Sequence, residues 1–250
     1  MKKWLKWFNG EAAPKAARRR QKSTFQQLME TARAIAETNP RGLKDLVRAV
    51  LLPYQDDYLL AVAEEGTDAR PNFTPELLFG RELVTRMLFE NGGMRCVSLP
   101  RENFRLELAK DPVFPWPWKH DRYVSALALI GESKIDRDDP WRRRSAGAWR
   151  EDDNHSVTLW LPWGIGFVYG GNHSIAAGIL AGEGTLSPRY VYDMSYVFSE
   201  FYTDGTFYRE RQTDRVVSLV ASQRAAALFE MGRLMHETGF PAHRDVLSAI

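Results

Sequence analysis

The chain has 250 residues, of which 44% are hydrophobic and 12% aromatic, and its formal net charge at pH 7 is +2. A chain of this length buries about 70% of the surface that its unfolded form exposes, so it needs no disulfide or metal to fold. Cys96 is the single cysteine, which excludes an intramolecular disulfide and a zinc site made of cysteines. A reducing, cytoplasmic location is therefore expected. No run approaches the roughly 20 apolar residues of a transmembrane helix, and the apolar run after Met1 is too short for a signal peptide.

Residues 1–22 form a basic, aromatic N-terminal arm. Its first residues are mostly apolar, and a run of lysine and arginine follows. The residues concerned are Trp4, Leu5, Trp7 and Phe8, then Lys15, Arg18, Arg19, Arg20 and Lys22. One interpretation is a docking arm for a protein partner, an anionic membrane surface or nucleic acid. The other is a basic terminus whose tryptophans pack on the body of the protein.

Residues 23–93 are predicted to be a helical region. Ser23 and Gln26 have the spacing of a capping box, and apolar residues at helical spacing follow them. Asn39-Pro40-Arg41-Gly42 is expected to end this first helix.

Two further helices are expected in the same region. The second covers 43–51, with Pro53 close to its end, and 58–63 continues the helical pattern. Thr74-Pro75 begins the third, which is predicted to run to Phe89.

Residues 94–250 are predicted to form an α+β domain that ends in a C-terminal helix. Strands are expected at 94–99, 157–161, 165–169 and 189–194, helices at 122–131, 174–181 and 214–236, and a tight turn at 203–206. Three prolines in 111–118 exclude regular structure there. Residues 132–154 are rich in charge and are predicted to be a surface loop.

The segment Gly170-Gly171-Asn172-His173-Ser174 joins a predicted strand to a predicted helix. Two glycines let the backbone turn sharply and approach a ligand closely. The first turn of the helix offers unpaired N–H groups and the positive end of the helix dipole. Such a turn is typical of a phosphate site, but it also serves as a plain connection between a strand and a helix.

The longer segment 168–178, Val-Tyr-Gly-Gly-Asn-His-Ser-Ile-Ala-Ala-Gly, resembles the signature turn of the ParB/sulfiredoxin-like superfamily. Members of that superfamily carry a Gly-x-His-Arg-like or Gly-x-Arg-Arg-like turn that opens an alanine-rich helix. The elements predicted at 122–131, 157–161 and 189–194 fall where that fold places a helix and two strands. The resemblance covers roughly residues 94–200 and implies a small mixed sheet with helices.

In that superfamily the turn binds nucleotide phosphates, as ATP or CTP, and some members are described as nucleases. The resemblance therefore implies that Gly170, Gly171, Asn172, His173 and Ser174 line a phosphate pocket. Two positions depart from the pattern. Ser174 stands where the family has arginine, and Asn172 stands where sulfiredoxin has its reactive cysteine, so sulfiredoxin chemistry is not expected.

The positive charge that Ser174 lacks must come from another segment if a polyphosphate binds. Arg122 is one candidate, and the run Arg142, Arg143 and Arg144 is the other. This run is the candidate nucleic-acid-binding segment, because it can follow a phosphate backbone. The alternative interpretation of this arginine run is a solvated loop, since aspartates lie close to it in the sequence.

His173 has two open roles. It is the candidate catalytic acid or base, or a structural residue that bonds to the 152–153 region or to a backbone carbonyl. His173 could also bind a metal together with His155 and with Asp152 or Asp153. The spacing of these residues matches no known set of metal ligands, so no metal site is predicted.

Four tryptophans can likewise have either a functional or a structural role. Trp116, Trp118, Trp160 and Trp163 can serve as a base-stacking platform. We favour packing in the core, which is the more frequent use of aromatic side chains.

The sequence favours a protein that binds a nucleotide or nucleic-acid phosphate. If this protein is an enzyme, it would be a ParB-like nucleotide hydrolase or nuclease. The alternative is a non-enzymatic subunit of a bacterial defence or toxin–antitoxin complex that acts through protein–protein contacts. Basic side chains converge on the turn in the first case and need not do so in the second. Whether the chain is an enzyme, and which cofactor it uses, stays open at this point.

Overall fold

The computed structural model describes residues 22–90, 93–95, 97–135 and 147–243. Most of the N-terminal arm, the run Arg142, Arg143 and Arg144, and Cys96 lie outside these residues. The described chain mixes helices and strands and is α+β, as predicted.

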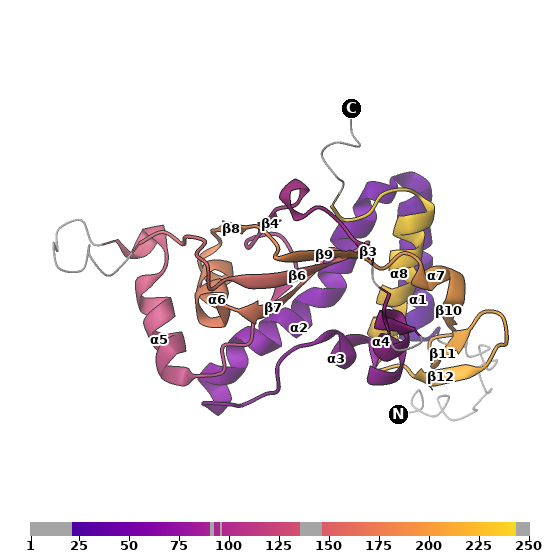
Figure 1. Cartoon of the computed structure of the whole chain (residues 1–250), viewed down its shortest axis with the longest axis horizontal. Coiled ribbons are helices and arrows are strands. Elements are labelled where there is room, and N and C mark those ends of the chain that lie inside the picture. The colour runs from indigo at the N-terminus through magenta and orange to yellow at the C-terminus, as the bar shows by residue number, and fades with distance from the viewer. Residues whose placement is uncertain (1–21, 91–92, 96, 136–146, 244–250) are drawn as a thin grey trace, which may run out of the picture.

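The elements follow one another along the chain as Figure 1 shows. The helices are α1 (Thr24–Thr38), α2 (Leu43–Glu65), α3 (Pro75–Phe79), α4 (Arg81–Leu88), α5 (His120–Leu129), α6 (Asn172–Ala181), α7 (Val197–Glu200) and α8 (Gln223–Glu237). The strands are β1 (Phe89–Glu90), β2 (Gly93–Met94), β3 (Val97–Ser98), β4 (Leu106–Glu107), β5 (Val113–Phe114), β6 (Ser156–Leu161), β7 (Ile165–Gly170), β8 (Thr185–Leu186), β9 (Tyr190–Asp193), β10 (Phe201–Thr203), β11 (Phe207–Glu210) and β12 (Val216–Leu219).

A five-stranded mixed sheet lies at the centre, in the order β3-β9-β6-β7-β5 (Figure 1). β6 and β7 form the predicted antiparallel hairpin, and α6 follows β7 directly. β9 runs parallel to β6, and β5 runs parallel to β7. At the start of β6, Ser156 lies opposite Gly170, beside the glycine turn. At its end, Leu161 lies opposite Asp193 of β9. The two ends of β6 therefore face two different regions of the molecule.

Alternate residues of the central strands face two separate apolar clusters. Trp160 and Phe167 belong to the larger cluster, with side chains from α1, α2, α4 and α8. Leu159 and Val168 belong to the second cluster, with Ile175 of α6. The period of two is that of strands buried on both faces. The predicted helical region and the predicted α+β region both contribute side chains to the larger cluster.

The capping box predicted for the first helix is confirmed. The Gln26 N–H donates to Ser23 Oγ at 3.2 Å, and the Ser23 N–H donates to Gln26 Oε1 at 3.0 Å. α1 lies side by side with α8 (Figure 1), which joins the first helix of the described chain to the last.

The expectation that Pro53 lies close to a helix end is wrong, because α2 continues through it to Glu65. Leu51 and Leu59, on either side of the proline, are both buried in the core. Buried Gln55 also donates to the carbonyl oxygen of Val113 at 2.6 Å. Tertiary packing on both sides therefore outweighs the backbone hydrogen bond that proline removes.

The single helix predicted from Thr74 to Phe89 is in fact two. Gly80 has a φ of +85° and ends α3, after which α4 begins at Arg81. A residue in this left-handed region cannot continue a right-handed helix.

Two other segments contain strands that the sequence did not predict. Residues 214–236 begin with β12, which pairs with β11, and α8 starts only after Ser222. Between its flanking prolines, Val113–Phe114 pairs with β7 as β5. A two-residue strand is short enough to fit between prolines, because neither residue in it has lost its N–H.

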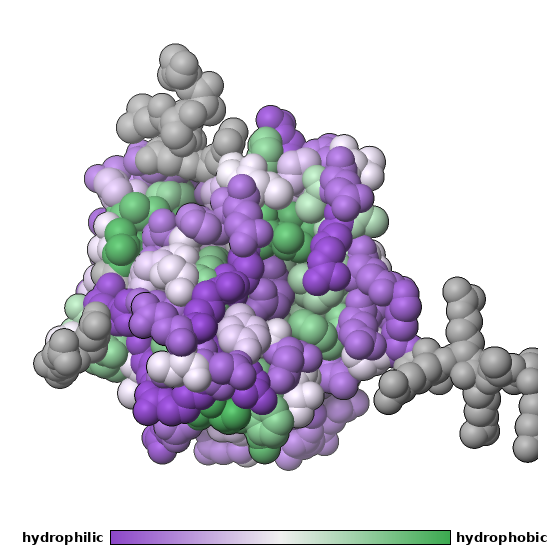
Figure 2. Space-filling model, turned by 90° about the vertical axis from the view of Figure 1, so that its right-hand side faces the viewer, coloured by the Kyte–Doolittle hydropathy of each residue, from purple (hydrophilic) through white to green (hydrophobic). Residues whose placement is uncertain are grey.

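The face that carries α8 and the small sheet β10–β12 is mainly hydrophilic (Figure 2), and its apolar side chains lie in small separate areas. Within the described ranges, none of the helices combines the length and the apolar character that crossing a membrane requires.

Candidate functional site

The glycine turn has the backbone geometry of a sharp strand-to-helix connection. Gly171 is the N-cap of α6 and has φ +75° and ψ 20°, in the left-handed region. A Cβ on Gly171 would lie 2.2 Å from His155 Cδ2, and one on Gly170 would lie 2.5 Å from the Asn154 carbonyl oxygen. Both glycines are therefore required by the close approach of the chain before β6.

The three polar side chains that follow are each bonded to another part of the chain. Asn172 Oδ1 accepts from the Trp116 N–H at 2.7 Å. His173 Nε2 lies 3.1 Å from the Lys119 nitrogen and 3.2 Å from its carbonyl oxygen. Ser174 Oγ lies 3.0 Å from His155 Nε2. The turn thus fastens α6 to the segment that begins α5 on one side and to the start of β6 on the other.

His173 is held as a neutral imidazole. Burial lowers its pKa, the hydrogen bond to the Lys119 backbone raises it, and the nearby Arg122 guanidinium lowers it. With Nε2 engaged by Lys119, Nδ1 is the ring nitrogen left for other partners. Of the two roles open for His173, the geometry supports a structural one, although the backbone partner lies at Lys119 and not near Asp152.

His155 supports the turn from the other side. Burial lowers the pKa of this histidine, against the raising effect of Asp152 and Glu151. The Asp152 N–H donates to His155 Nδ1 at 2.8 Å, so the neutral ring carries its proton on Nε2 and donates it to Ser174 Oγ.

Trp149 completes this support. Its ring stacks on His155 with centroids 4.8 Å apart, and its Nε1–H donates to the Ser174 carbonyl oxygen at 2.9 Å. The sequence assigns Trp149 to a surface loop, but only 7% of it is exposed. The sequence feature that could have indicated this burial is the presence of a large aromatic residue within a charged stretch.

The two histidines do not form a joint site. His155 bonds to Ser174 and Asp152, whereas His173 bonds to Lys119. In the part of the chain that the structure describes, no group of three or more histidine, cysteine, aspartate or glutamate side chains could hold a metal ion.

Arg122 lies near the turn, whereas the Arg142–Arg144 run is outside the described residues. The Arg122 guanidinium lies 5.8 Å from the ring centre of Trp118, and Trp118 packs edge-on to His173 at 5.7 Å. Among the described residues, no carboxylate forms an ion pair with Arg122 or with the Lys119 ammonium. The start of α5 therefore brings the positive charge of Arg122 to the neighbourhood of α6, with acidic Asp121 beside it in the same turn.

The other predicted aromatic residues divide into two pairs. Trp160 and Trp163 are buried in the core, which confirms the packing interpretation for them. Trp116 and Trp118 are half-buried, with ring centres 6.2 Å apart. They belong to the segment that Asn172 and His173 fasten.

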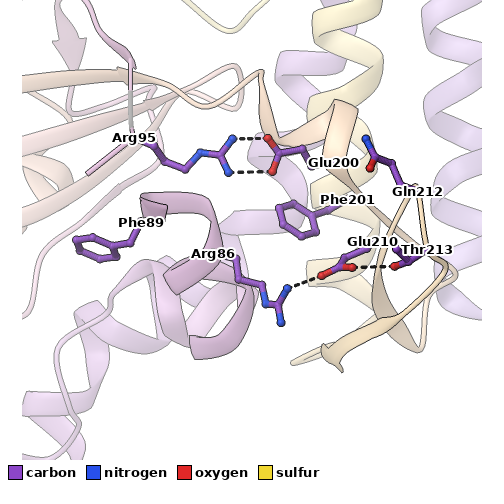
Figure 3. A pocket seen from close by; sticks show the side chains of 8 residues that line it. All are labelled: Arg86, Phe89, Arg95, Glu200, Phe201, Glu210, Gln212 and Thr213. Carbon is purple, nitrogen blue, oxygen red and sulfur yellow. Dashed lines mark hydrogen bonds and ion pairs between the residues drawn. The ribbon is translucent and has the colours of Figure 1, made fainter. Parts of the chain in front are cut away.

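A cavity of about 430 Å³ lies between α4 and the small sheet (Figure 3). Arg95 donates to Glu200 through Nη1 and Nη2, and Arg86 donates to Glu210 through Nη1. Hydrogen bonds from Arg215 and Thr213, together with Arg86, lower the pKa of Glu210 from 4.5 to about 2. The charges lining this cavity are already matched to one another, so it offers no excess charge to a ligand.

Comparison with known proteins gives a family. Residues 11–242 match a family of unknown function (DUF6710), so the chain belongs to this family. No curated protein and no solved structure matches the chain.

The packing of His155 against the turn predicts the effect of Gly171→Ala. Gly182, at the other end of α6, has nearly the same backbone angles, φ 71° and ψ 26°, but a Cβ there would meet nothing within 4 Å. Gly182→Ala should lower the free energy of unfolding by about 1–2 kcal/mol, the cost of a left-handed alanine. Gly171→Ala should lose about 1–3 kcal/mol more, because of the clash. Urea unfolding measures both, and equal losses would show that His155 does not pack on the turn.

The bonding of His173 predicts a pH-dependent effect of His173→Ala. At pH 7.5 the variant should lose about 1–2 kcal/mol, because the Lys119 backbone loses its partner. Burial lowers the folded-state pKa of His173 below its ordinary 6.5, so its contribution is complete above pH 6.5 and declines as the pH falls. The gap between wild type and variant should therefore narrow at pH 5.5. Unchanged stability, with loss of a ligand-dependent activity, would instead mark His173 as a ligand-contacting residue. His120→Ala, at an exposed position, is the control.

Proposed function

We propose that this member of the DUF6710 family binds a phosphate-bearing ligand, either a nucleotide or a nucleic-acid backbone, at the N-terminal end of α6. The observation that carries the proposal is the position of Arg122 beside the turn, on a segment fastened there by Asn172 and His173. Convergence of basic side chains is the feature that separates a phosphate site from a plain connection.

The start of α6 suits an anion because nothing in the helix neutralises it. Its N-cap is Gly171, which has no side chain to accept a hydrogen bond, and its first turn contains no acidic residue. In α1 and α8, by contrast, Ser23 and Ser222 accept from first-turn N–H groups. The first-turn N–H groups of α6 have no partner within the helix, so they can donate hydrogen bonds to a bound oxyanion.

The resemblance to the ParB/sulfiredoxin-like superfamily belongs to the same proposal. An antiparallel strand pair, the glycine turn, a helix containing alanines and a further strand follow in the order that the resemblance implies. In this chain the charge that Ser174 lacks would come from Arg122 or from the run Arg142, Arg143 and Arg144. The expected cytoplasmic location is part of the proposal too, since nucleotides are abundant there.

The proposal is one of binding, with hydrolysis as a secondary possibility. His173 Nε2 is occupied by the Lys119 backbone, and His155 Nε2 by Ser174. Both imidazoles therefore position the polypeptide around the site. A nucleotide hydrolase or nuclease activity would have to use His173 Nδ1 or a group that the ligand itself brings.

A second candidate function is a non-enzymatic subunit of a bacterial defence or toxin–antitoxin complex. The observation that favours it is the internal bonding of all three polar side chains of the turn, which gives the turn a purely architectural use. Phe89 and Met94 are opposite one another in the β1–β2 pair and are 51% and 58% exposed, so they offer an apolar contact for a partner. The predicted N-terminal arm would be a further interface.

Charge reversal at Arg122 tests the proposed function. Isothermal titration with ATP, and separately with inorganic phosphate, should show binding to the wild type. Arg122→Glu should weaken it by roughly tenfold or more, because a charged hydrogen bond contributes about 1.5–3 kcal/mol. Arg33→Ala is the control, since Arg33 is exposed on α1, far along the chain from the turn. Equal affinities for wild type and Arg122→Glu, or no binding to either, would favour the subunit interpretation.

A further inference from the structure

A crevice lies at the carboxyl ends of β6 and β9, at the opposite end of β6 from the glycine turn. The two strands are parallel neighbours, and the chain leaves both at the same edge of the sheet, after Leu161 and Asp193. Crevices at the carboxyl ends of parallel strands are common ligand sites. Two cavities of about 320 Å³ and 520 Å³ open here, and Asp193, Ser195 and His236 line both of them.

The shared wall carries polar groups that have no partner in the described part of the chain. Asp193 Oδ1 accepts from the Ser195 N–H at 2.9 Å, but the second carboxylate oxygen makes no hydrogen bond or ion pair there. The Ser195 hydroxyl and both ring nitrogens of His236 likewise make no hydrogen bond to any described residue. These groups come from two elements, the loop after β9 and the last turn of α8, and they converge on the same space.

The remaining lining of the smaller cavity is largely apolar. Leu99, Phe104, Leu161 and Pro162 contribute to it. An apolar cavity of a few hundred cubic ångströms with a small number of convergent polar groups is the usual form of a small-molecule site.

The charges around the crevice favour a cation. Within the described residues Asp193 forms no ion pair, and Glu237 lines the larger cavity. Arg233 also lines it, but its guanidinium is bound by Glu230 and by the carbonyl oxygens of Phe198 and Phe201. The C-terminal end of α8, with its negative dipole end, lies at the same place.

We infer that this crevice binds a small molecule in which an ammonium group is attached to an apolar body. The ammonium group bonds to the free Asp193 oxygen and the Ser195 hydroxyl, and the apolar body lies against Phe104 and Leu161. The site is separate from the one proposed at α6, since the two lie at opposite ends of β6, so either can fail without the other.

Benzylamine is the probe, because it is a protonated amine on an apolar ring at neutral pH. Benzyl alcohol and benzoate are its neutral and anionic counterparts of similar shape. Ligand-observed NMR with the full chain should show binding of benzylamine, and at least tenfold weaker binding of the other two. Asp193→Asn should weaken benzylamine binding about tenfold, which corresponds to about 1.4 kcal/mol.

Two further variants keep the test decisive if Asp193→Asn alters the fold. Glu237→Gln, at an exposed position, should weaken benzylamine binding about twofold through its charge alone. Asp56→Asn, on the exposed side of α2, should leave binding unchanged. The inference is overturned if benzylamine does not bind, if benzyl alcohol or benzoate binds as well, or if folded Asp193→Asn binds benzylamine with the wild-type affinity.

Discussion

The hydrogen bonds from the backbone of Trp116 and Lys119 to Asn172 and His173 hold the starts of α5 and α6 together. These two contacts bridge segments more than 50 residues apart in the sequence. They determine where Arg122 lies, because Arg122 is in the first turn of α5. Without them the start of α6 would have an uncapped helix terminus but no positive side chain beside it. The electrostatic character of the candidate site therefore depends on polar side chains that themselves have a structural role.

The central strand β6 separates the molecule's two candidate sites. At its first residues lie the glycine turn and the support from His155 and Trp149. At its last residues lies the crevice of Asp193, Ser195 and His236. Arg122 lies beside the first region, and Asp193 and Glu237 lie at the second. Apolar clusters cover both faces of the sheet, and both candidate sites lie at its ends.

The elements that the sequence predicted well are those with strong local signals. The capping box of Ser23 and Gln26 and the β6–β7 hairpin follow from neighbouring residues alone. The elements missed depend on distant partners. β5 exists because β7 lies beside it, α2 passes Pro53 because its buried residues pack on both sides, and β12 forms by pairing with β11. For the site, sequence reasoning identified the turn, Arg122 and both histidines, but not Trp149 or the bonding of His155 to Ser174. No local pattern records a contact between a loop and a helix terminus 25 residues later.

The most direct test of the phosphate site is a titration of the ¹⁵N-labelled protein with inorganic phosphate, followed through its backbone amide and arginine side-chain N–H signals. An oxyanion at the start of α6 would accept hydrogen bonds from first-turn N–H groups. The largest shifts should therefore fall on the amides of Asn172, His173 and Ser174, together with the Arg122 side-chain Nε–H. Shifts confined to other regions, or unchanged signals for these four groups at saturating phosphate, would contradict the account.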